Sequence, residues 1–341
     1  MNDQVAVAVT EPSQVGEARR TAARLAQDAG LPEVRRAEVA IVATELAGNL
    51  AKYGEQGRLF LQTLRSPRGC EVELLAVDRG PGMADVQRCL RDGFSSAGTP
   101  GTGLGAVRRL SSEFDIHSTP GAGTVVLSRI GADPAPAAGA SSFHWAAVST
   151  PALHELVCGD IWRILERDGS LAVMVADGLG HGPQAAAAAS RAADEFDAGG
   201  FDGPGPFFES AHRALVGSRG AALAAALVTP GGGIRYAGIG NIAGSIVQAD
   251  ESRGLMSHNG TVGLQMRKAQ PLDYPWPDGA LLIMHSDGIS HRWTVNGHDG
   301  LQSRHPAVIA AVLHRDHTRG RDDSTVVVIR RSSAAAGGGS R

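Results

Sequence analysis

The sequence is poor in lysine and has no concentrated positive charge. Lys52 and Lys268 are its only lysines, and the arginines are scattered along the 341 residues rather than gathered into a patch. With a formal net charge of -3, such a chain has no general electrostatic affinity for nucleic acid. We therefore expect no nucleic-acid partner.

Long apolar runs and targeting signals are also missing. No apolar stretch reaches the roughly 18 residues that a membrane-spanning helix needs. The first residues also lack a basic segment followed by an apolar one. We expect a cytoplasmic protein that neither enters nor crosses a membrane.

Cysteine is scarce, and its spacing carries no metal-binding pattern. The three cysteines, Cys70, Cys89 and Cys158, are an odd number and are far apart in the sequence. This argues against a zinc site built on cysteine pairs and against a disulfide framework. Reduced thiols are expected, as in a cytosolic protein.

The length and one break in the hydrophobic pattern indicate two domains. A chain of 341 residues exceeds the usual size of one domain, and its 43% hydrophobic content is enough for ordinary cores. Residues 131–142 contain prolines and alanines without apolar periodicity, as in an extended linker. Residues 332–341 are rich in alanine, glycine and serine and are expected to form a disordered tail. The predicted domains are residues 1–130 and 143–331.

Hydrophobic periodicity predicts an α+β protein. The first domain is expected to contain helices at residues 12–30, 32–53 and 104–112, and strands at 58–64, 71–78, 114–117 and 124–130. In the second domain we expect helices at 184–196 and 206–216, and strands at 161–166, 171–177, 221–229, 234–238, 242–248, 280–286 and 324–329. These elements indicate a layered α/β module followed by a strand-rich α+β module.

Three elements of the first domain follow one another in an order that suits a nucleotide. Glu45 and Asn49 are four residues apart on a predicted helix and face the same side, where a general base could lie beside a metal ligand. Asp78 ends a predicted strand in Asp78-Arg-Gly-Pro-Gly82, and a carboxylate there can accept a hydrogen bond from a purine amino group. The glycines of residues 98–105 expose backbone N–H groups at the start of a helix, which suits phosphate oxygens. Each element alone has an ordinary structural explanation, but together they indicate a nucleotide site.

This order resembles the GHKL (Bergerat) ATPase fold, and within it the RsbT-type serine kinases of bacterial stress-response switches. The likeness covers residues 1–130 and includes Asp92-Gly-Phe-Ser-Ser96 and Val107-Arg-Arg-Leu110. The resemblance implies ATP and Mg²⁺ as cofactors. It also implies that the substrate is a serine or threonine of a STAS-domain protein.

The resemblance also implies roles for particular residues. Glu45 is expected to be the catalytic base, Asn49 to bind Mg²⁺, and Asp78 to contact adenine. The other expected ATP-binding positions are Gly80, Gly82, Gly101, Gly103, Gly105 and Thr124. Phosphoryl transfer depends mainly on positioning and charge neutralisation, and these residue types can supply both.

Four acidic turns carry the chemistry of the second domain. They contain Asp160, Asp177-Gly178, Asp287-Gly288 and Asp322-Asp323. Two carboxylates ~4 Å apart repel by roughly 4 kcal/mol at an effective dielectric near 20, so a cluster of them requires cations. Oxygen ligands favour Mg²⁺ or Mn²⁺, and two such ions can activate a water for hydrolysis of a phosphomonoester.

The same turns, in the same order, resemble the metal-dependent serine/threonine phosphatases of the SpoIIE and RsbX type. The likeness covers about residues 143–331 and rests on five separated segments: Cys158-Gly-Asp160, Val175-Ala-Asp-Gly-Leu-Gly180, Arg219-Gly-Ala221, Gly240-Asn241 and His285-Ser-Asp-Gly288. With the first resemblance, it implies a Bergerat-type α/β sandwich followed by a phosphatase β-sandwich flanked by helices.

The second resemblance implies a metal-binding set. Asp177 is expected to bridge both metals and to be essential for catalysis. The other expected ligands are Asp160, the carbonyl of Gly178, Asp287 and Asp322. Asp323 is the rival of Asp322, and the spacing in the sequence does not decide between them.

One position departs from the family pattern. Eukaryotic relatives have a histidine directly after the Asp-Gly pair, where this chain has Leu179. The donor of the leaving-group proton is therefore unassigned. His181 lies near but occupies a different position, and a polar residue at a helix start explains it as well.

These expectations combine into one leading hypothesis and two alternatives. The leading hypothesis is a bifunctional regulator of a partner-switching pathway. It phosphorylates a STAS-domain anti-sigma-factor antagonist or stressosome-type protein with ATP and dephosphorylates that protein or a relative. In the first alternative the ATP-binding domain only docks onto a partner and regulates the phosphatase. In the second it binds a sigma-pathway regulator or sigma factor directly.

Overall fold

The computed structural model describes residues 4–66, 69–91, 103–132, 142–230, 232–249, 251–266 and 268–332. The chain forms two compact units, one of Met1–Ala140 with Val295–Arg315 and one of Ser141–Thr294 with Asp316–Arg341. The predicted domain limits remain a prediction. The structure differs from them in grouping residues 295–315 with the first unit. None of the described helices is long and apolar enough to span a membrane.

The first unit contains a five-stranded antiparallel sheet in the order β1-β2-β3-β5-β4. The strands are β1 (Val5–Ala8), β2 (Arg58–Ser66), β3 (Gly69–Val77), β4 (Glu113–Ser118) and β5 (Thr124–Gly131). The helical segments are η1 (Pro12–Gln14), α1 (Val15–Asp28), α2 (Glu33–Tyr53), α3 (Val86–Cys89) and α4 (Gly103–Leu110).

Helix α2 packs on this sheet through one apolar face. Its fully buried residues, which include Val39, Leu46 and Leu50, recur every three or four positions and so share one face. They join Leu59 and Leu74 of the sheet in a single apolar core. Burial of this face leaves the half-buried face with Glu45 and Asn49 available for a site.

The second unit is a sandwich of two sheets. One sheet has the order β13-β10-β9-β8-β7, with β14 also paired to β10, and the other has the order β12-β11-β15-β16-β6. The strands of the first sheet are β7 (Asp160–Arg167), β8 (Ser170–Gly178), β9 (Ala221–Val228), β10 (Gly233–Ile239), β13 (Ser257–His258) and β14 (Leu272–Pro275). Those of the second are β6 (Phe143–Thr150), β11 (Ala243–Gln248), β12 (Glu251–Leu255), β15 (Leu281–His285) and β16 (Ser324–Arg331).

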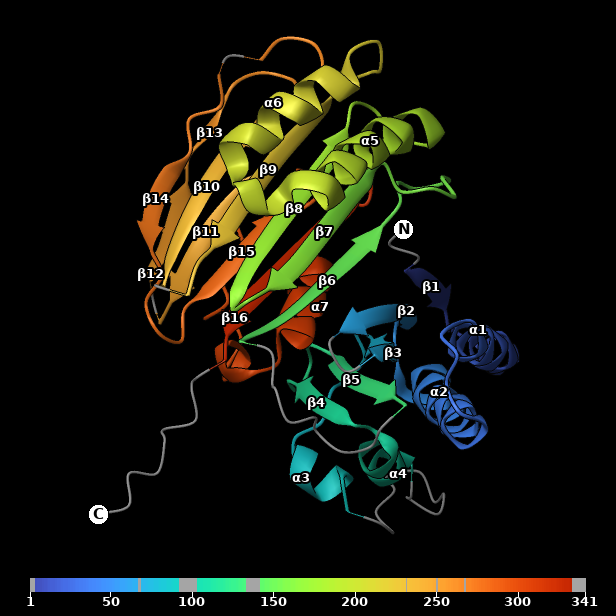
Figure 1. The fold of residues 1–341 in the computed structure, drawn as a ribbon. Helices are drawn as coiled ribbons and strands as arrows, with labels where there is room; N and C mark the ends of the chain where they lie inside the picture. Colours follow the sequence, from blue (N-terminus) through green and yellow to red (C-terminus); the bar gives the residue numbers. More distant parts are fainter. Residues whose placement is uncertain are drawn as a thin grey trace. The chain divides into compact units, whose positions relative to one another are not determined.

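Two helices cover the outer face of the first of these sheets (Figure 1). They are α5 (Pro183–Gly199) and α6 (Pro204–Leu215), and the short η2 (Gly200–Asp202) joins them. Alanines of α5, among them Ala189 and Ala192, pack against Ala172 and Met174 of β8. Small side chains on both sides let the helix lie close to the sheet. Between the two sheets, Val175, Ile246 and Leu282 belong to a separate apolar core.

The predicted α+β class and the sandwich architectures are confirmed, and every predicted helix and strand overlaps an observed one. The elements that the periodicity does not predict are β1, β6, β12, β13, β14, α3, η2, η3 (Leu301–Ser303) and α7 (Pro306–His317). Residues 306 to 315 of α7 are all buried, so its sequence lacks the polar face by which an amphipathic helix is recognised.

Candidate active sites

Two of the predicted metal ligands face each other across neighbouring strands. Asp160 begins β7, Asp177 lies next to the end of β8, and the two are direct partners in the antiparallel pairing. Side chains at such positions have Cβ atoms roughly 5 Å apart. Antiparallel pairing of β7 with β8 therefore brings together two carboxylates that are 17 positions apart in the sequence.

Three further aspartates lie within electrostatic range of this pair. Burial raises the pKa of Asp177 to about 9, and the charges of four other aspartates add to the rise: Asp160, Asp287, Asp322 and Asp323. Burial also raises the pKa of Asp160 to about 7, although a hydrogen bond from Ser286 opposes this rise. The acidic turns predicted to meet are thus brought together, and their mutual repulsion favours a bound cation.

The acidic cluster fits a divalent cation on one further ground. Asp160 Oδ1 is buried and accepts no hydrogen bond from the described residues, and a cation can satisfy such an oxygen. Among the described residues, no three of the five aspartates have carboxylate oxygens that all lie within 4.8 Å of one another, so they form no preassembled site of three carboxylates.

Gly178 lies where strand β8 meets helix α5. A Cβ atom at this position would lie 2.0 Å from the carbonyl oxygen of Ala185, so no other residue fits without movement of the helix. The backbone N–H of Gly178 donates to the carbonyl of Gly159 at 3.2 Å. This hydrogen bond holds the turn that follows Asp177 next to the turn that precedes Asp160.

The structure distinguishes the two rivals at the start of β16. Asp323 is only 2% exposed, and its Oδ1 accepts the N–H of Ala152 at 2.9 Å. Asp322 is half-buried, and its Oδ1 accepts the N–H of Asp323 at 2.9 Å. Asp323 therefore has a structural hydrogen bond to a distant loop, although its Oδ2, like Oδ1 of Asp160, is buried without a hydrogen-bond partner among the described residues. Asp322 is more accessible to an ion.

Hydrogen bonds orient two of the predicted ligands. Ser286 Oγ donates to Asp160 Oδ2 at 2.6 Å, and Asn241 Nδ2 donates to Asp287 Oδ2 at 2.6 Å. A hydrogen bond to a carboxylate holds its oxygens in a fixed orientation toward a bound ion. Both donors lie in segments that resemble RsbX, but the sequence alone does not reveal what they contact.

Two side chains at the loop after Asp177 have no assigned role from the sequence. His181 Nδ1 lies 2.6 Å from Glu155 Oε1, so the carboxylate orients the ring. Gly180 has φ +88°, and a Cβ there would lie 2.9 Å from Nη1 of Arg219. An oriented imidazole and an exposed guanidinium thus border the loop that follows the acidic cluster.

In the first unit, Glu45 and Asn49 lie one turn apart on α2, and both are half-buried. The first residue of α4 lies against Glu45, because a Cβ at Gly103 would be 2.7 Å from Glu45 Oε2. Gly105 is buried within α4. The structure therefore brings the predicted base to the start of the helix that follows the glycine-rich loop. Gly101 of that loop lies outside the described residues.

The predicted adenine side is formed at the ends of β3 and β5. Asp78 follows β3, and its Oδ1 accepts the N–H of Gly80 at 2.7 Å. The N–H of Asp78 donates to the carbonyl of Thr124 at 3.0 Å, so these two predicted contacts are neighbours. Burial raises the pKa of Asp78, although the hydrogen bonds from Gly80 and Thr124 oppose this rise. Gly82 has φ +67°, and a Cβ there would lie 2.2 Å from the carbonyl oxygen of Thr119.

One neighbour of Asp78 comes from a distant part of the chain. Arg315, at the end of the segment that groups with the first unit, donates from Nη1 to the carbonyl oxygen of Asp78 at 3.1 Å. Arg79 in turn donates from Nη2 to the carbonyl oxygen of Arg315. Arg79 and Arg315 are 236 positions apart, so no local sequence pattern predicts this contact.

Comparisons with known proteins agree with both units. The family model of the histidine kinase-like ATPase domain matches residues 8–129, and that of stage II sporulation protein E (SpoIIE) matches residues 167–332. The fold and the two sites thus define a protein that joins a kinase-like ATPase domain to a phosphatase domain of the SpoIIE type.

The serine/threonine-protein kinase RsbT of Bacillus subtilis (strain 168) is 32% identical over 126 residues, which are 37% of this chain and 95% of RsbT. Through this domain the chain belongs to the RsbT family of serine/threonine-protein kinases. The fusion and the enzyme class expected from the sequence, a serine/threonine phosphatase with a kinase-related domain, are confirmed.

Two solved structures resemble the phosphatase part. A structure from work on the bacterial stressosome, a modular system adapted to control secondary messenger signaling, is 26% identical with a TM-score of 0.51. The match covers 55% of this chain and 99% of that one. RsbX in complex with magnesium is 20% identical with a TM-score of 0.51 and shares the fold over 56% of this chain and 96% of RsbX.

Proposed function

We propose that the chain is a cytoplasmic, bifunctional regulator of a partner-switching pathway. One unit transfers phosphate from ATP to a serine or threonine of a STAS-domain protein, and the other removes phosphate from such a protein. The observation that carries the phosphatase half is the pairing of Asp160 with Asp177, with three more aspartates in electrostatic range. Two similarities support a partner of this kind. RsbT matches the first part of the chain, and the structure from work on the stressosome matches 55% of the chain.

In the phosphatase unit, the residues that hold Mg²⁺ or Mn²⁺ are Asp160, Asp177, the carbonyl of Gly178, Asp287 and Asp322. When bound, the ions supply an activated water and neutralise the phosphate. Asp177 has the central position in the cluster. It is the pairing partner of Asp160, and the negative charges of all four other aspartates raise its pKa. Ser286 and Asn241 hold Asp160 and Asp287 in orientation through their hydrogen bonds.

In the kinase unit, Glu45 accepts the proton of the substrate hydroxyl as the oxygen attacks the γ-phosphorus and ADP leaves. Asn49, one helical turn away, holds the Mg²⁺ that accompanies the nucleotide. Asp78 and Thr124 bind the adenine, and the glycines at positions 80, 82, 101, 103 and 105 accommodate the nucleotide close to the backbone. ATP here is the phosphate donor and therefore a substrate.

One incubation tests both halves. The purified protein is mixed with candidate STAS-domain proteins in phosphorylated and unphosphorylated form, with labelled ATP, and with Mn²⁺ in the presence or absence of a chelator. We expect label to enter the unphosphorylated protein, and phosphate to leave the phosphorylated one only when Mn²⁺ is free. Transfer of no label to any STAS protein would refute the kinase half.

Two variants separate the roles. Asp177→Asn is expected to abolish hydrolysis without loss of the fold, and unchanged turnover would remove this residue from the mechanism. Asn49→Asp is expected to abolish label transfer. If regulation of the phosphatase by ATP survives in Asn49→Asp, the ATP-binding unit acts by docking and not by catalysis.

A further inference from the structure

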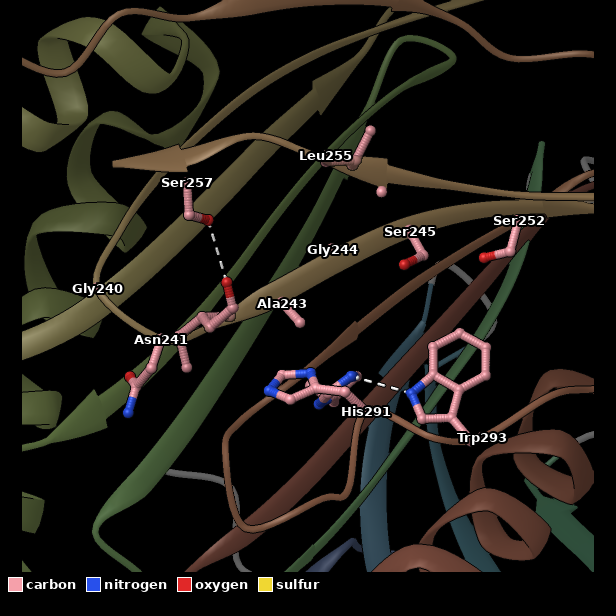
Figure 2. Close-up of a pocket in the computed structure, with 13 residues that line it drawn as sticks. Gly240, Asn241, Ala243, Gly244, Ser245, Ser252, Leu255, Ser257, His291 and Trp293 are labelled. Atoms are coloured by element: carbon pink, nitrogen blue, oxygen red, sulfur yellow. Dashed lines mark hydrogen bonds between the residues drawn. The ribbon is translucent and has the colours of Figure 1, made fainter. Parts of the chain in front are cut away.

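A pocket of about 430 Å³ opens in the second unit beside the acidic cluster (Figure 2). Its walls include Gly240, Asn241, Gly244, Ser245, Ser252 and Trp293. In Figure 2 the two serines point into the same space as the Trp293 ring. None of the predicted metal ligands lines it, so this is a second space and not the metal site itself.

One residue of the pocket wall contacts the acidic cluster. Asn241 lines the pocket, and its Nδ2 donates to Asp287 Oδ2 at 2.6 Å. A substrate whose phosphate lies at the acidic cluster can therefore extend along Asn241 toward the pocket. The residues next to the phosphorylated one are the nearest groups that can enter it.

The aromatic wall of the pocket is held in place. Trp293 Nε1 donates to His285 Nε2 at 3.0 Å, and His285 Nδ1 lies 2.8 Å from the carbonyl oxygen of Ser286. The imidazole therefore has its proton on Nδ1 and accepts at Nε2. His285 is 2% exposed and ends β15, two residues before Asp287. The indole is therefore hydrogen-bonded to a buried side chain close to the acidic cluster.

The opposite wall is lined by small residues and is long enough for several residues of an extended chain. Ser245 of β11 and Ser252 of β12 lie on the same face of the strand pair, because Val247 is the partner of Ser252. The wall runs from Asn241, two residues before β11 begins at Ala243, to Ser245, and spans at most roughly 13 Å, the length of about four extended residues. A flat wall of glycine and serine leaves room for a large side chain against the indole.

The charge of the pocket restricts what enters it. Among the described residues, no lysine, arginine, aspartate or glutamate side chain lines it. Asp287, which accepts a hydrogen bond from Asn241 of the pocket wall, belongs to a cluster of five aspartates that repels an acidic segment. An uncharged segment with a large apolar side chain fits these walls best.

We propose that this pocket binds the segment that flanks the phosphorylated serine or threonine of the substrate protein. The occupant is an extended, uncharged stretch of about four residues with a large apolar side chain against Trp293. The proposal rests on the proposed phosphatase function. It adds that the enzyme selects its substrate by the residues beside the phosphate.

The test compares two phosphoserine peptides with para-nitrophenyl phosphate as a substrate that has no flanking chain. One peptide has leucines on both sides of the phosphoserine, and the other has aspartates at the same positions. The variant Ser252→Tyr fills the pocket, and Trp293→Ala removes its aromatic wall. The matched control is Glu251→Tyr, because the adjacent residue of β12 points to the opposite face and does not line the pocket.

We expect the wild type to prefer the leucine peptide. In both pocket variants, the ratio of kcat/KM for this peptide to that for para-nitrophenyl phosphate should fall about tenfold, as expected for loss of one aromatic contact. In Glu251→Tyr the ratio should stay within about twofold of the wild type.

The proposal is overturned if the ratio is unchanged in Ser252→Tyr and Trp293→Ala, or if both substrates lose activity equally. Equal hydrolysis of the two peptides by the wild type also overturns it. Failure of the proposed phosphatase function looks different, because then no substrate is hydrolysed in the presence of Mn²⁺.

Discussion

At the scale of single residues, neighbouring aspartates have different surroundings and therefore different expected roles. Asp323 is buried and accepts the N–H of Ala152, whereas Asp322 is half-buried and bonds only locally. The sequence places them side by side as rivals for one ligand position. Because their surroundings differ, two substitutions can test which of the two aspartates binds the metal.

Asp322→Ala is expected to weaken Mn²⁺ binding with little change in the stability of the metal-free protein, because its side chain is partly exposed. Asp323→Ala should lower the free energy of unfolding by about 1–3 kcal/mol, since the N–H of Ala152 loses its acceptor. Isothermal titration with Mn²⁺ and urea unfolding measure the two effects. Loss of Mn²⁺ affinity in Asp323→Ala alone would reverse the assignment.

A second residue-scale prediction concerns acid. Burial, with the charge of Arg58 as a smaller cause, lowers the pKa of His314 to about 3. An unfolded histidine takes up a proton near pH 6.5, so between these values the unfolded chain binds more protons and stability falls as the pH falls. From pH 7 to pH 5 this amounts to about 2 kcal/mol.

The variant His314→Leu isolates this contribution. Over the same pH interval the wild type should lose about 2 kcal/mol more than the variant, as measured by urea unfolding at each pH. Equal losses in the two proteins would show that His314 is not buried as a neutral ring.

At the scale of elements, the acidic cluster depends on how closely strand β8 approaches helix α5. The helix lies near the sheet because alanines line both surfaces, and Gly178 is at the point of closest approach. A methyl group there would lie 2.0 Å from the carbonyl oxygen of Ala185. The position of Asp177, one residue earlier, is therefore coupled to the packing of the helix.

Gly178→Ala is expected to lower the stability of the second unit by about 1–3 kcal/mol through overpacking, and to reduce phosphatase activity. Gly48→Ala is a matched control for stability, because a Cβ there meets nothing within 4 Å. Alanine in the middle of α2 should stabilise that helix by roughly 0.5–1 kcal/mol. Thermal unfolding compares the two, and a Gly178→Ala protein as stable and active as the wild type would contradict the close approach.

At the scale of the whole molecule, two units with separate sites should respond to separate ligands. The proposed nucleotide site uses residues of α2 and β5 and Asp78 after β3. The acidic cluster uses Asp160 of β7, Asp177 of β8 and aspartates next to β15 and β16. A ligand that binds only the folded state stabilises the unit that holds it. Each ligand therefore reports on one unit.

With Mg²⁺ held constant, ATP at 100 times its Kd should stabilise the first unit by about 2.7 kcal/mol, and Mn²⁺ should stabilise the second similarly. Asn49→Ala should remove the response to ATP and keep that to Mn²⁺, whereas Asp287→Ala should do the reverse. Differential scanning calorimetry follows both transitions. Loss of both responses in either variant would mean that the sites are not independent.

How much of the fold and of the two sites can be predicted from the sequence depends on whether each feature involves neighbouring residues or distant ones. The amphipathic pattern of α1, the alternation of β2 and each acidic turn are each contained within a few neighbouring residues, so they can be recognised in the sequence itself. Helix α7 is missed because it is buried along its length and has no polar face. The bond of Arg315 to Asp78, the orienting roles of Ser286 and Asn241, and the contact of His181 with Glu155 join distant positions and have no local pattern.

By itself, the sequence determined the types of its elements, the order of its acidic and glycine-rich turns, and through these the two classes of chemistry. Only the tertiary structure decided which carboxylate faces which, that Asp323 is buried while Asp322 is accessible, and that a pocket whose described lining includes no lysine, arginine, aspartate or glutamate lies beside the acidic cluster. The physical reason is that hydrophobic periodicity and turn residues act over a few positions. Repulsion between carboxylates, burial and hydrogen bonds between distant residues arise only once the strands are paired.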